Sequence, residues 1–284
     1  MYDIILDTLM DGIRLLPFLF VTYIIMEYIE HKMSAGTRRV VQASGRFGPL
    51  IGSIAGIFPQ CGFSAAAASL YAGRVITRGT LIAIFLSTSD EMLPVFISQQ
   101  VPVKIILSVL GMKVLIGMAA GFLLDLVFSV VKKEPQQEMD IHHMCEHDHC
   151  HCEDGIIKSA LVHTAQIFFF ILLVSFVLNL VISRIGEESL TEIILNQPLV
   201  GSVLSGIVGL IPNCAASVVI TQLYLDGAMS LGAMMSGLLV GAGVGLIVLY
   251  RTNDSLKENL EITAILYVIG VAAGMAVDFL GITL

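Results

Sequence analysis

Two short stretches, "IFPQCGFS" (57–64) and "LIPNCAAS" (210–217), carry a proline, an amide, a cysteine and a serine in the same order. Proline lacks a backbone N–H and leaves a carbonyl one turn earlier without its partner. Such carbonyls, amides and thiols are oxygen and sulfur ligands for a metal cation. Helix N-termini after each proline favour an anion instead, and plain kinks with cysteine as a small apolar residue are the structural alternative. The candidate substrate-binding residues here are Gln60, Cys61, Ser64, Asn213, Cys214 and Ser217.

A third stretch, "STSDEMLP" (87–94), places Asp90 and Glu91 inside an apolar segment. Acids inside a membrane are costly and by default mark ion or proton paths. Two carboxylates neutralise a cation of charge two, so we assign Asp90 and Glu91 to both substrate binding and proton coupling. The alternative is a structural ion pair of one acid with Lys113 or Arg14. The matching stretch "VGAGVGLI" (240–247) has no acid, so the predicted site is asymmetric.

The segment "HHMCEHDHCHC" (142–152) holds five of the seven histidines and three of the five cysteines. Histidine and cysteine at this density bind soft or borderline metals such as zinc, copper or nickel. The spacing differs from that of a zinc finger, so we expect a flexible scavenging or sensing segment, with an inert polar linker as the alternative. The candidate metal ligands of this loop are His142, His143, Cys145, His147, His149, Cys150, His151 and Cys152.

A membrane must position these residues, because the chain of 284 residues is 56% hydrophobic and only 13% charged. Its mean hydropathy is +0.88, and a soluble domain carries about 25% charged residues. Segments near 20 residues long are the length that crosses a bilayer. We expect ten apolar segments, at 4–30, 47–58, 62–73, 79–98, 102–131, 156–185, 198–211, 215–226, 229–250 and 259–282.

The sequence contains an internal repeat, in which residues 56–79 align with 209–232 at an offset of 153. The stretches "IGMAAGFLLDL" (116–126) and "IGVAAGMAVDF" (269–279) match at the same offset, and they include Asp125 and Asp278. The symmetry of these two acids indicates a shared capping or packing role. We therefore predict a first repeat (1–131), a His/Cys-rich loop (132–155) and a second repeat (156–284).

The positive residues predict that the two repeats are inverted, because cytoplasmic loops carry an excess of lysine and arginine. The short pairs of segments, split by Pro59 and Pro212, then enter and leave on one side each as re-entrant hairpins. Each repeat has three crossings plus one hairpin, so both termini lie outside and the His/Cys loop is cytoplasmic. The residues that mark the cytoplasmic side are Lys32, Arg38, Arg39, Arg46, Arg74, Arg78, Lys132, Lys133, Arg251 and Lys257. Inverted repeats with broken helices are typical of secondary transporters.

Several stretches resemble a bacterial membrane family of ten-transmembrane heavy-metal exporters, whose members also appear as arsenic efflux proteins or manganese transporters. The resemblance covers nearly the whole chain and implies metal or metalloid export at the plasma (inner) membrane. The eight candidate residues named above for substrate binding fall on the matching motifs. The matching stretches are "LLPFLFVTYIIMEYIEHK" (15–32), "FPQCGFSAAAASLYAGRVITRGTL" (58–81), "LSTSDEMLPV" (86–95), "CEHDHCHC" (145–152) and "IPNCAASVVITQLYLDG" (211–227).

The sequence favours an all-α polytopic transporter and not an enzyme, because it has no nucleophile elbow, phosphate loop or HExxH motif. The first hypothesis is gradient-driven antiport that exports a divalent metal, with manganese as the first substrate to test. The others are an arsenite or organoarsenical permease that uses Cys61 and Cys214, an anion transporter that uses half-helix dipoles, and a non-transporting metal sensor. We expect no permanently bound cofactor and no nucleic acid. The expected partners are the transported ion, the bilayer and a second copy of the chain.

Overall fold

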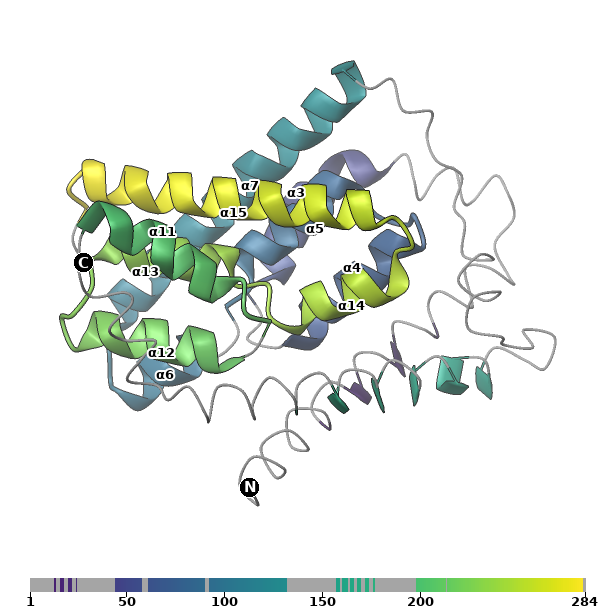
Figure 1. The fold of residues 1–284 in the computed structure, drawn as a ribbon, viewed down its shortest axis with the longest axis horizontal. Coiled ribbons are helices and arrows are strands. Elements are labelled where there is room, and N and C mark those ends of the chain that lie inside the picture. The colour runs from purple at the N-terminus through teal and green to yellow at the C-terminus, as the bar shows by residue number, and fades with distance from the viewer. Residues whose placement is uncertain are drawn as a thin grey trace.

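The computed structural model of the protein describes residues 44–57, 61–89, 92–131, 198–212 and 214–282, with isolated helical positions between 13 and 24 and between 157 and 176. These residues form helices and contain no strand. A 3-10 helix, η1 (Ser44–Phe47), comes first. The α-helices, labelled in Figure 1, are α3 (Gly48–Ala55), α4 (Cys61–Ala72), α5 (Arg78–Ser87), α6 (Met92–Ser98), α7 (Val103–Val131), α11 (Pro198–Gly209), α12 (Cys214–Leu225), α13 (Leu231–Val240), α14 (Val244–Thr252) and α15 (Leu256–Phe279).

Four stretches within the described residues are long and apolar enough to cross a membrane: Arg78–Ser98, Val103–Val130, Leu231–Thr252 and Leu256–Phe279. The chain is therefore an all-helical, multi-pass membrane protein. The expected segments 4–30 and 156–185 lie largely outside the described residues. The total of ten segments accordingly stays a prediction.

Two of these four stretches are broken helices, where the sequence predicted the single segments 79–98 and 229–250. The second one leaves the helix at Gly241, and α14 starts after Gly243, which has φ 52° and ψ −137°. Only glycine adopts that backbone conformation readily. In Arg78–Ser98, α5 ends at Ser87 and the next residue, Thr88, leaves the helical conformation with φ −57° and ψ 129°. Helix α6 then starts at Met92.

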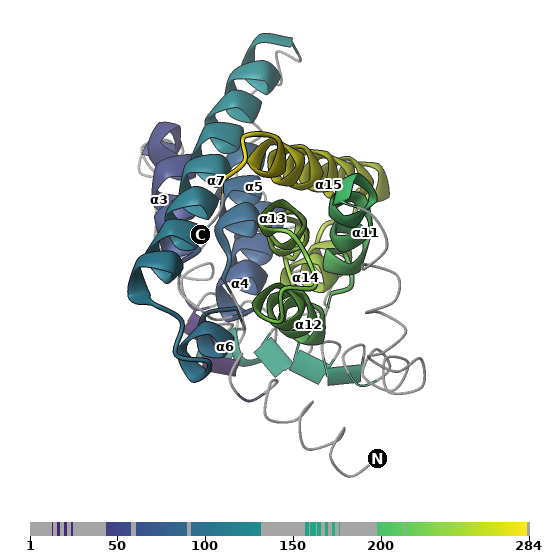
Figure 2. The same cartoon turned by 90° about the vertical axis from the view of Figure 1, so that its left-hand side faces the viewer.

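The helices pack in two equivalent groups. Helices α3, α5 and α7 pack together, and so do α11, α13 and α15, which occupy the matching positions at the offset of 153. The remaining helices cross between the groups, since α4 packs on α14 and α12 packs on α6 (Figures 1 and 2). Each of these two contacts therefore joins a helix of the first repeat to a helix of the second repeat.

The same hydrogen bonds recur in both groups at the offset of 153. Asp125 of α7 accepts from the Gly79 amide at 2.9 Å and from Thr77 Oγ1 at 2.8 Å. Asp278 of α15 accepts from the Gly232 amide at 2.8 Å and from Ser230 Oγ at 2.7 Å. Each acid thus caps the start of a neighbouring helix, as its symmetry in the sequence indicated.

The turns after α4 and α12 lie at opposite ends of α15. Residues of the first turn contact Glu258, in the opening turn of α15, and the turn before Gly232 contacts Asp278, near its end. Twenty residues of α-helix span about 30 Å. The two equivalent turns are therefore separated by roughly the thickness of a hydrocarbon core.

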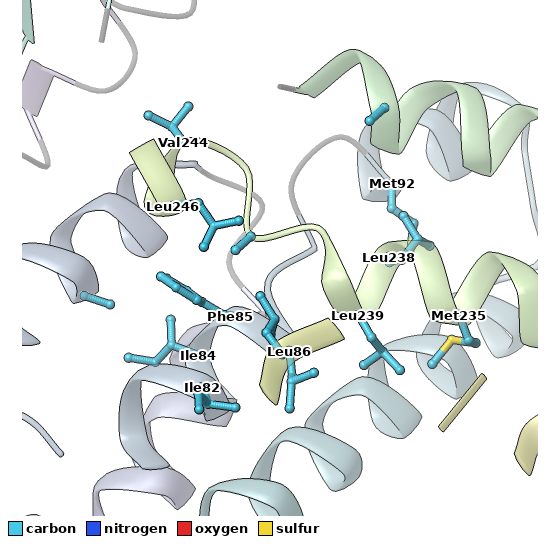
Figure 3. Close-up of a cluster of buried hydrophobic side chains, with 14 of the residues drawn as sticks. Ile82, Ile84, Phe85, Leu86, Met92, Met235, Leu238, Leu239, Val244 and Leu246 are labelled. Atoms are coloured by element: carbon cyan, nitrogen blue, oxygen red, sulfur yellow. The ribbon is translucent and has the colours of Figure 1, made fainter. Parts of the chain in front are cut away.

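A continuous apolar core lies between the repeats. It joins fully buried residues such as Phe85 and Leu86 of α5 with Leu239 of α13 and Leu246 of α14. Figure 3 shows these side chains together beside the break between α13 and α14. The broken helices are therefore the inner elements, while α7 and α15 expose a larger share of their surface.

Candidate functional site

The two cysteine motifs start helices in the structure. Cys61 is the first residue of α4 and Cys214 is the first residue of α12. In the second motif α11 ends at Gly209 and α12 starts at Cys214, so the helix is interrupted around Pro212, as the sequence predicted. Pro59 of the first motif lies outside the described residues. The side chains of these cysteines, and all of Gln60 and Asn213, lie outside the described residues.

The two serines of the same motifs are buried. Ser64 is fully buried in α4, and Ser217 is 9% exposed in α12. A Cβ built on Gly245 of α14 would lie 2.7 Å from Ser64 Cβ and 2.9 Å from the Ser64 carbonyl carbon. Ser64 therefore lies at a close contact between α4 of the first repeat and α14 of the second. The Ser217 carbonyl accepts a hydrogen bond from Thr221 Oγ1 at 2.6 Å.

Asp90 and Glu91 fall between the end of α5 and the start of α6, and both lie outside the described residues. The candidate loop ligands, His142 to Cys152, lie outside them as well. Within the described ranges, no group of three His, Cys, Asp or Glu side chains could hold a metal ion. The eight predicted substrate residues thus remain a prediction as a set.

Lys113 is buried in the first half of α7, with 1% of its surface exposed. Its ammonium donates to the Leu238 carbonyl of α13 at 2.7 Å. The sequence offered Lys113 as a partner for an intramembrane acid. The contact described for it is with the last turn of a helix from the second repeat. Because Asp90 and Glu91 lie outside the described residues, the pairing with an acid stays a prediction.

A buried ionic cluster, which the sequence did not predict, joins the repeats at the end where α15 begins. We call it the Glu258 cluster, and its members are Tyr71, Arg74, Arg78, Asn253 and Glu258. Arg74 makes two hydrogen bonds of 3.0 Å, one to each Glu258 oxygen. Arg78, the Tyr71 hydroxyl and the Asn253 amide also donate to Glu258.

The cluster is tightly enclosed. The Glu258 side chain is 6% exposed, against 20% for Arg74 and 14% for Arg78. The Arg74 guanidinium also lies 5.3 Å from the Tyr71 ring centroid, and Arg78 lies 5.2 Å from the Phe128 ring centroid of α7. Burial lowers the pKa of Arg74, but the hydrogen bond and charge of Glu258 raise it by more, so that its pKa lies above its ordinary value.

No sequence pattern could have paired these residues. Arg74 and Glu258 are separated by 184 positions and belong to different repeats. Arg74 and Arg78 served only as markers of the cytoplasmic side. The single local signal is "SLKE" (255–258), which has the spacing of a capping box. In the structure Ser255 caps the start of α15 by accepting from the Glu258 amide.

A comparison with known families matches residues 1–188 to the family described as "Putative, 10TM heavy-metal exporter". No curated protein and no solved structure matches the chain. The matched residues include the first cysteine motif, the Asp90–Glu91 stretch and the His/Cys loop, and they agree with the resemblance seen in the sequence. Because the match covers more than half of the chain, this protein belongs to that heavy-metal exporter family.

Proposed function

We propose that the protein is a secondary active transporter that exports a divalent metal cation across the bacterial plasma membrane, with manganese as the first substrate to test. The observation that carries this proposal is the matched packing of two helix groups around two broken helices. Broken helices at the interface of two repeats are where secondary transporters bind their substrates.

We further infer that residues 1–131 and 156–284 are inverted repeats, joined by a cytoplasmic loop at 132–155. The placement of the two equivalent turns at opposite ends of α15 supports this. The packing of α11 on α12 agrees with a re-entrant hairpin. The Glu258 cluster marks the cytoplasmic end, since Arg74 and Arg78 belong to it. Both termini would then lie outside.

The substrate would bind between the tips of the two hairpins, near the breaks in the inner helices. Oxygen ligands from Gln60, Asp90, Glu91 and Asn213 suit Mn²⁺. Exchange of the metal for protons on Asp90 and Glu91 would couple export to the proton gradient. The stretch that holds both acids interrupts the helix between Ser87 and Met92, which supports a role for it in binding.

The test is metal transport by the purified protein in proteoliposomes, with Glu91→Gln compared with wild type. We expect the variant to lose Mn²⁺ transport, because one of the two carboxylates that balance the metal charge is gone. Glu261→Gln, a matched change of a partly exposed acid in α15, should transport normally. Equal Mn²⁺ transport by Glu91→Gln and wild type would refute the acidic site.

A second candidate function is export of arsenite or an organoarsenical, favoured by the position of both motif cysteines at the first residue of a helix. Thiols there would bind a trivalent arsenic. The double change Cys61→Ser and Cys214→Ser should then remove arsenic resistance in cells and leave manganese resistance intact. Loss of manganese resistance alone would favour the metal-cation function.

A further inference from the structure

The turn after α4 holds an arginine in a backbone conformation that suits glycine. Arg74 has φ 57°, in the left-handed region. Its amide donates to the Tyr71 carbonyl at 2.9 Å, and the Val75 amide donates to the Leu70 carbonyl, also at 2.9 Å. This pair of bonds is a Schellman motif, whose left-handed position is usually glycine. The Cβ atom of an arginine strains the backbone there.

The equivalent turn in the second repeat has the same bonds and carries the glycine. Gly227 matches Arg74 at the offset of 153 and has φ 71°. Its amide donates to the Tyr224 carbonyl at 3.0 Å, and the Ala228 amide donates to the Leu223 carbonyl at 2.9 Å. Glycine therefore forms this turn without strain. The arginine of the first repeat must be explained by its side chain.

That side chain reaches the second repeat. The Arg74 guanidinium makes one hydrogen bond of 3.0 Å to each carboxylate oxygen of Glu258. It also lies 5.3 Å from the centroid of the Tyr71 ring. The residue that matches Glu258 at the offset of 153 is Ile105. The strained arginine and the acid that binds it thus occur together, and both are replaced by uncharged residues in the matching positions.

The contact lies where α4 and α14 end. These helices pack on each other. Tyr71, in the last turn of α4, and Asn253, the residue after α14, both donate to the Glu258 carboxylate. Figure 1 shows α4 and α14 toward the end of the bundle where α15 begins, and α6 and α12 toward the other end. Separation of α4 from the start of α15 would break the contact between Arg74 and Glu258.

We propose that Arg74 and Glu258 form a strained latch at the end where α15 begins. While the latch is closed, the two hydrogen bonds hold Arg74 in the left-handed region. When they break, Arg74 leaves that region and the last turn of α4 opens. The strain offsets part of the stability of the ion pair and so favours its release. This inference rests on the proposed transport function, in which this end opens and closes in each cycle.

The test is hydrogen–deuterium exchange of the turn at 70–78, measured by mass spectrometry on the purified full chain. The matching turn at 223–231 is the reference within the same protein. The first variant is Glu258→Gln, which opens the latch. It is also combined with Arg74→Gly and, separately, with Arg74→Ala. Both combinations remove the arginine charge, but only Arg74→Gly removes the Cβ atom that makes the left-handed region costly.

Wild type should protect both turns from exchange. Glu258→Gln should speed exchange at 70–78 by about tenfold, which corresponds to the cost of a left-handed residue other than glycine. The reference turn should stay unchanged. Adding Arg74→Gly should restore the protection of the turn at 70–78. Adding Arg74→Ala should not restore it, because alanine keeps the strain.

Gly227→Ala calibrates the backbone cost, since a Cβ atom there meets open space. This change should speed exchange at 223–231 by about tenfold in an otherwise wild-type protein. Should Glu258→Gln not fold, Arg74→Gly and Arg74→Ala by themselves decide the matter. The Arg74→Ala protein should then exchange about tenfold faster at 70–78 than the Arg74→Gly protein.

Three results would overturn the latch: an unchanged turn at 70–78 in Glu258→Gln, equal protection by Arg74→Gly and Arg74→Ala, or no effect of Gly227→Ala. Equal protection would assign the whole effect to the buried charge. The exchange measurement needs no transported ion, so it separates the two proposals. The expected exchange pattern in a protein that does not transport Mn²⁺ would refute the manganese function and leave the latch standing. Mn²⁺ transport with an unchanged turn would refute the latch alone.

Discussion

Replacing Glu258 with glutamine removes the negative charge on which Arg74 and Arg78 converge. Breaking a buried ion pair by removing one partner costs about 3–5 kcal/mol. Because the two arginines keep 20% and 14% of their side-chain surface in contact with solvent, we take the lower end, about 3 kcal/mol. The cluster joins elements of both repeats at the end where α15 begins. Its loss should therefore destabilise the conformation in which that end is closed.

A penalty of about 3 kcal/mol corresponds to a shift of about a hundredfold in the closed-to-open equilibrium. The two motif cysteines report on it. In a protein whose loop cysteines Cys145, Cys150 and Cys152 are replaced by serine, the remaining thiols are Cys61 and Cys214. A membrane-impermeant maleimide added to inside-out vesicles should label these thiols at least about tenfold faster in Glu258→Gln. Labelling in right-side-out vesicles should slow.

Glu261→Gln is the matched control, because that side chain is 36% exposed and pairs with Arg78 at a longer distance of 3.5 Å. It should leave both labelling rates unchanged. Unfolding temperature is measured in parallel. A Glu258→Gln protein that unfolds at a lower temperature but labels at the control rate would refute the role of the cluster in closing this end and leave it a purely stabilising contact.

Three further predictions follow from the packing and the loop. Gly245→Ala should lower the free energy of unfolding by about 1–3 kcal/mol in thermal or denaturant unfolding, because a methyl group there lies 2.7 Å from a side-chain atom of α4. Gly111→Ala is the control, because the added methyl group meets open space, and it should be neutral. Asp125→Asn and Asp278→Asn should each cost about 1–3 kcal/mol, and the double variant should cost the sum, since the two acids share no described partner. Deletion of residues 140–154 should preserve basal metal transport in proteoliposomes and alter its apparent affinity; complete loss would favour a sensor that uses the loop alone.

The sequence showed the repeat and indicated a shared capping or packing role for Asp125 and Asp278, but it did not identify their partners. Aligned glycines and acids at the offset of 153 make the same contacts in the structure, as Gly79 with Asp125 and Gly232 with Asp278 demonstrate. Both residues of such a pair belong to the same helix group, and the pair occurs once in each repeat, so both of its residues are visible in the alignment of the repeats. The helical class and the membrane assignment followed from composition, because composition averages over many residues.

The breaks in the inner helices were not predictable from hydropathy. A window over 229–250 has no charged residue, and glycines such as those at 241, 243 and 245 are also common where membrane helices pack closely. The structure gives Gly243 a positive φ and gives Gly245 a close approach to α4. Both uses require a glycine, so that the residue type alone does not distinguish a break from a tight packing contact.

The two repeats are alike in packing but differ in charge. The positions equivalent to Arg74, Arg78 and Glu258 at the other end are Gly227, Leu231 and Ile105, and Leu266 replaces Lys113. Two identical repeats would make the conformations open to either side equal in energy. In the proposed transport cycle the Glu258 cluster would make them unequal, because its contacts would form in the conformation closed at that end and break in the conformation open there. On the proposed function, the proton gradient would set the direction of net transport, whereas the Glu258 cluster would favour a resting protein that is closed at the end where α15 begins.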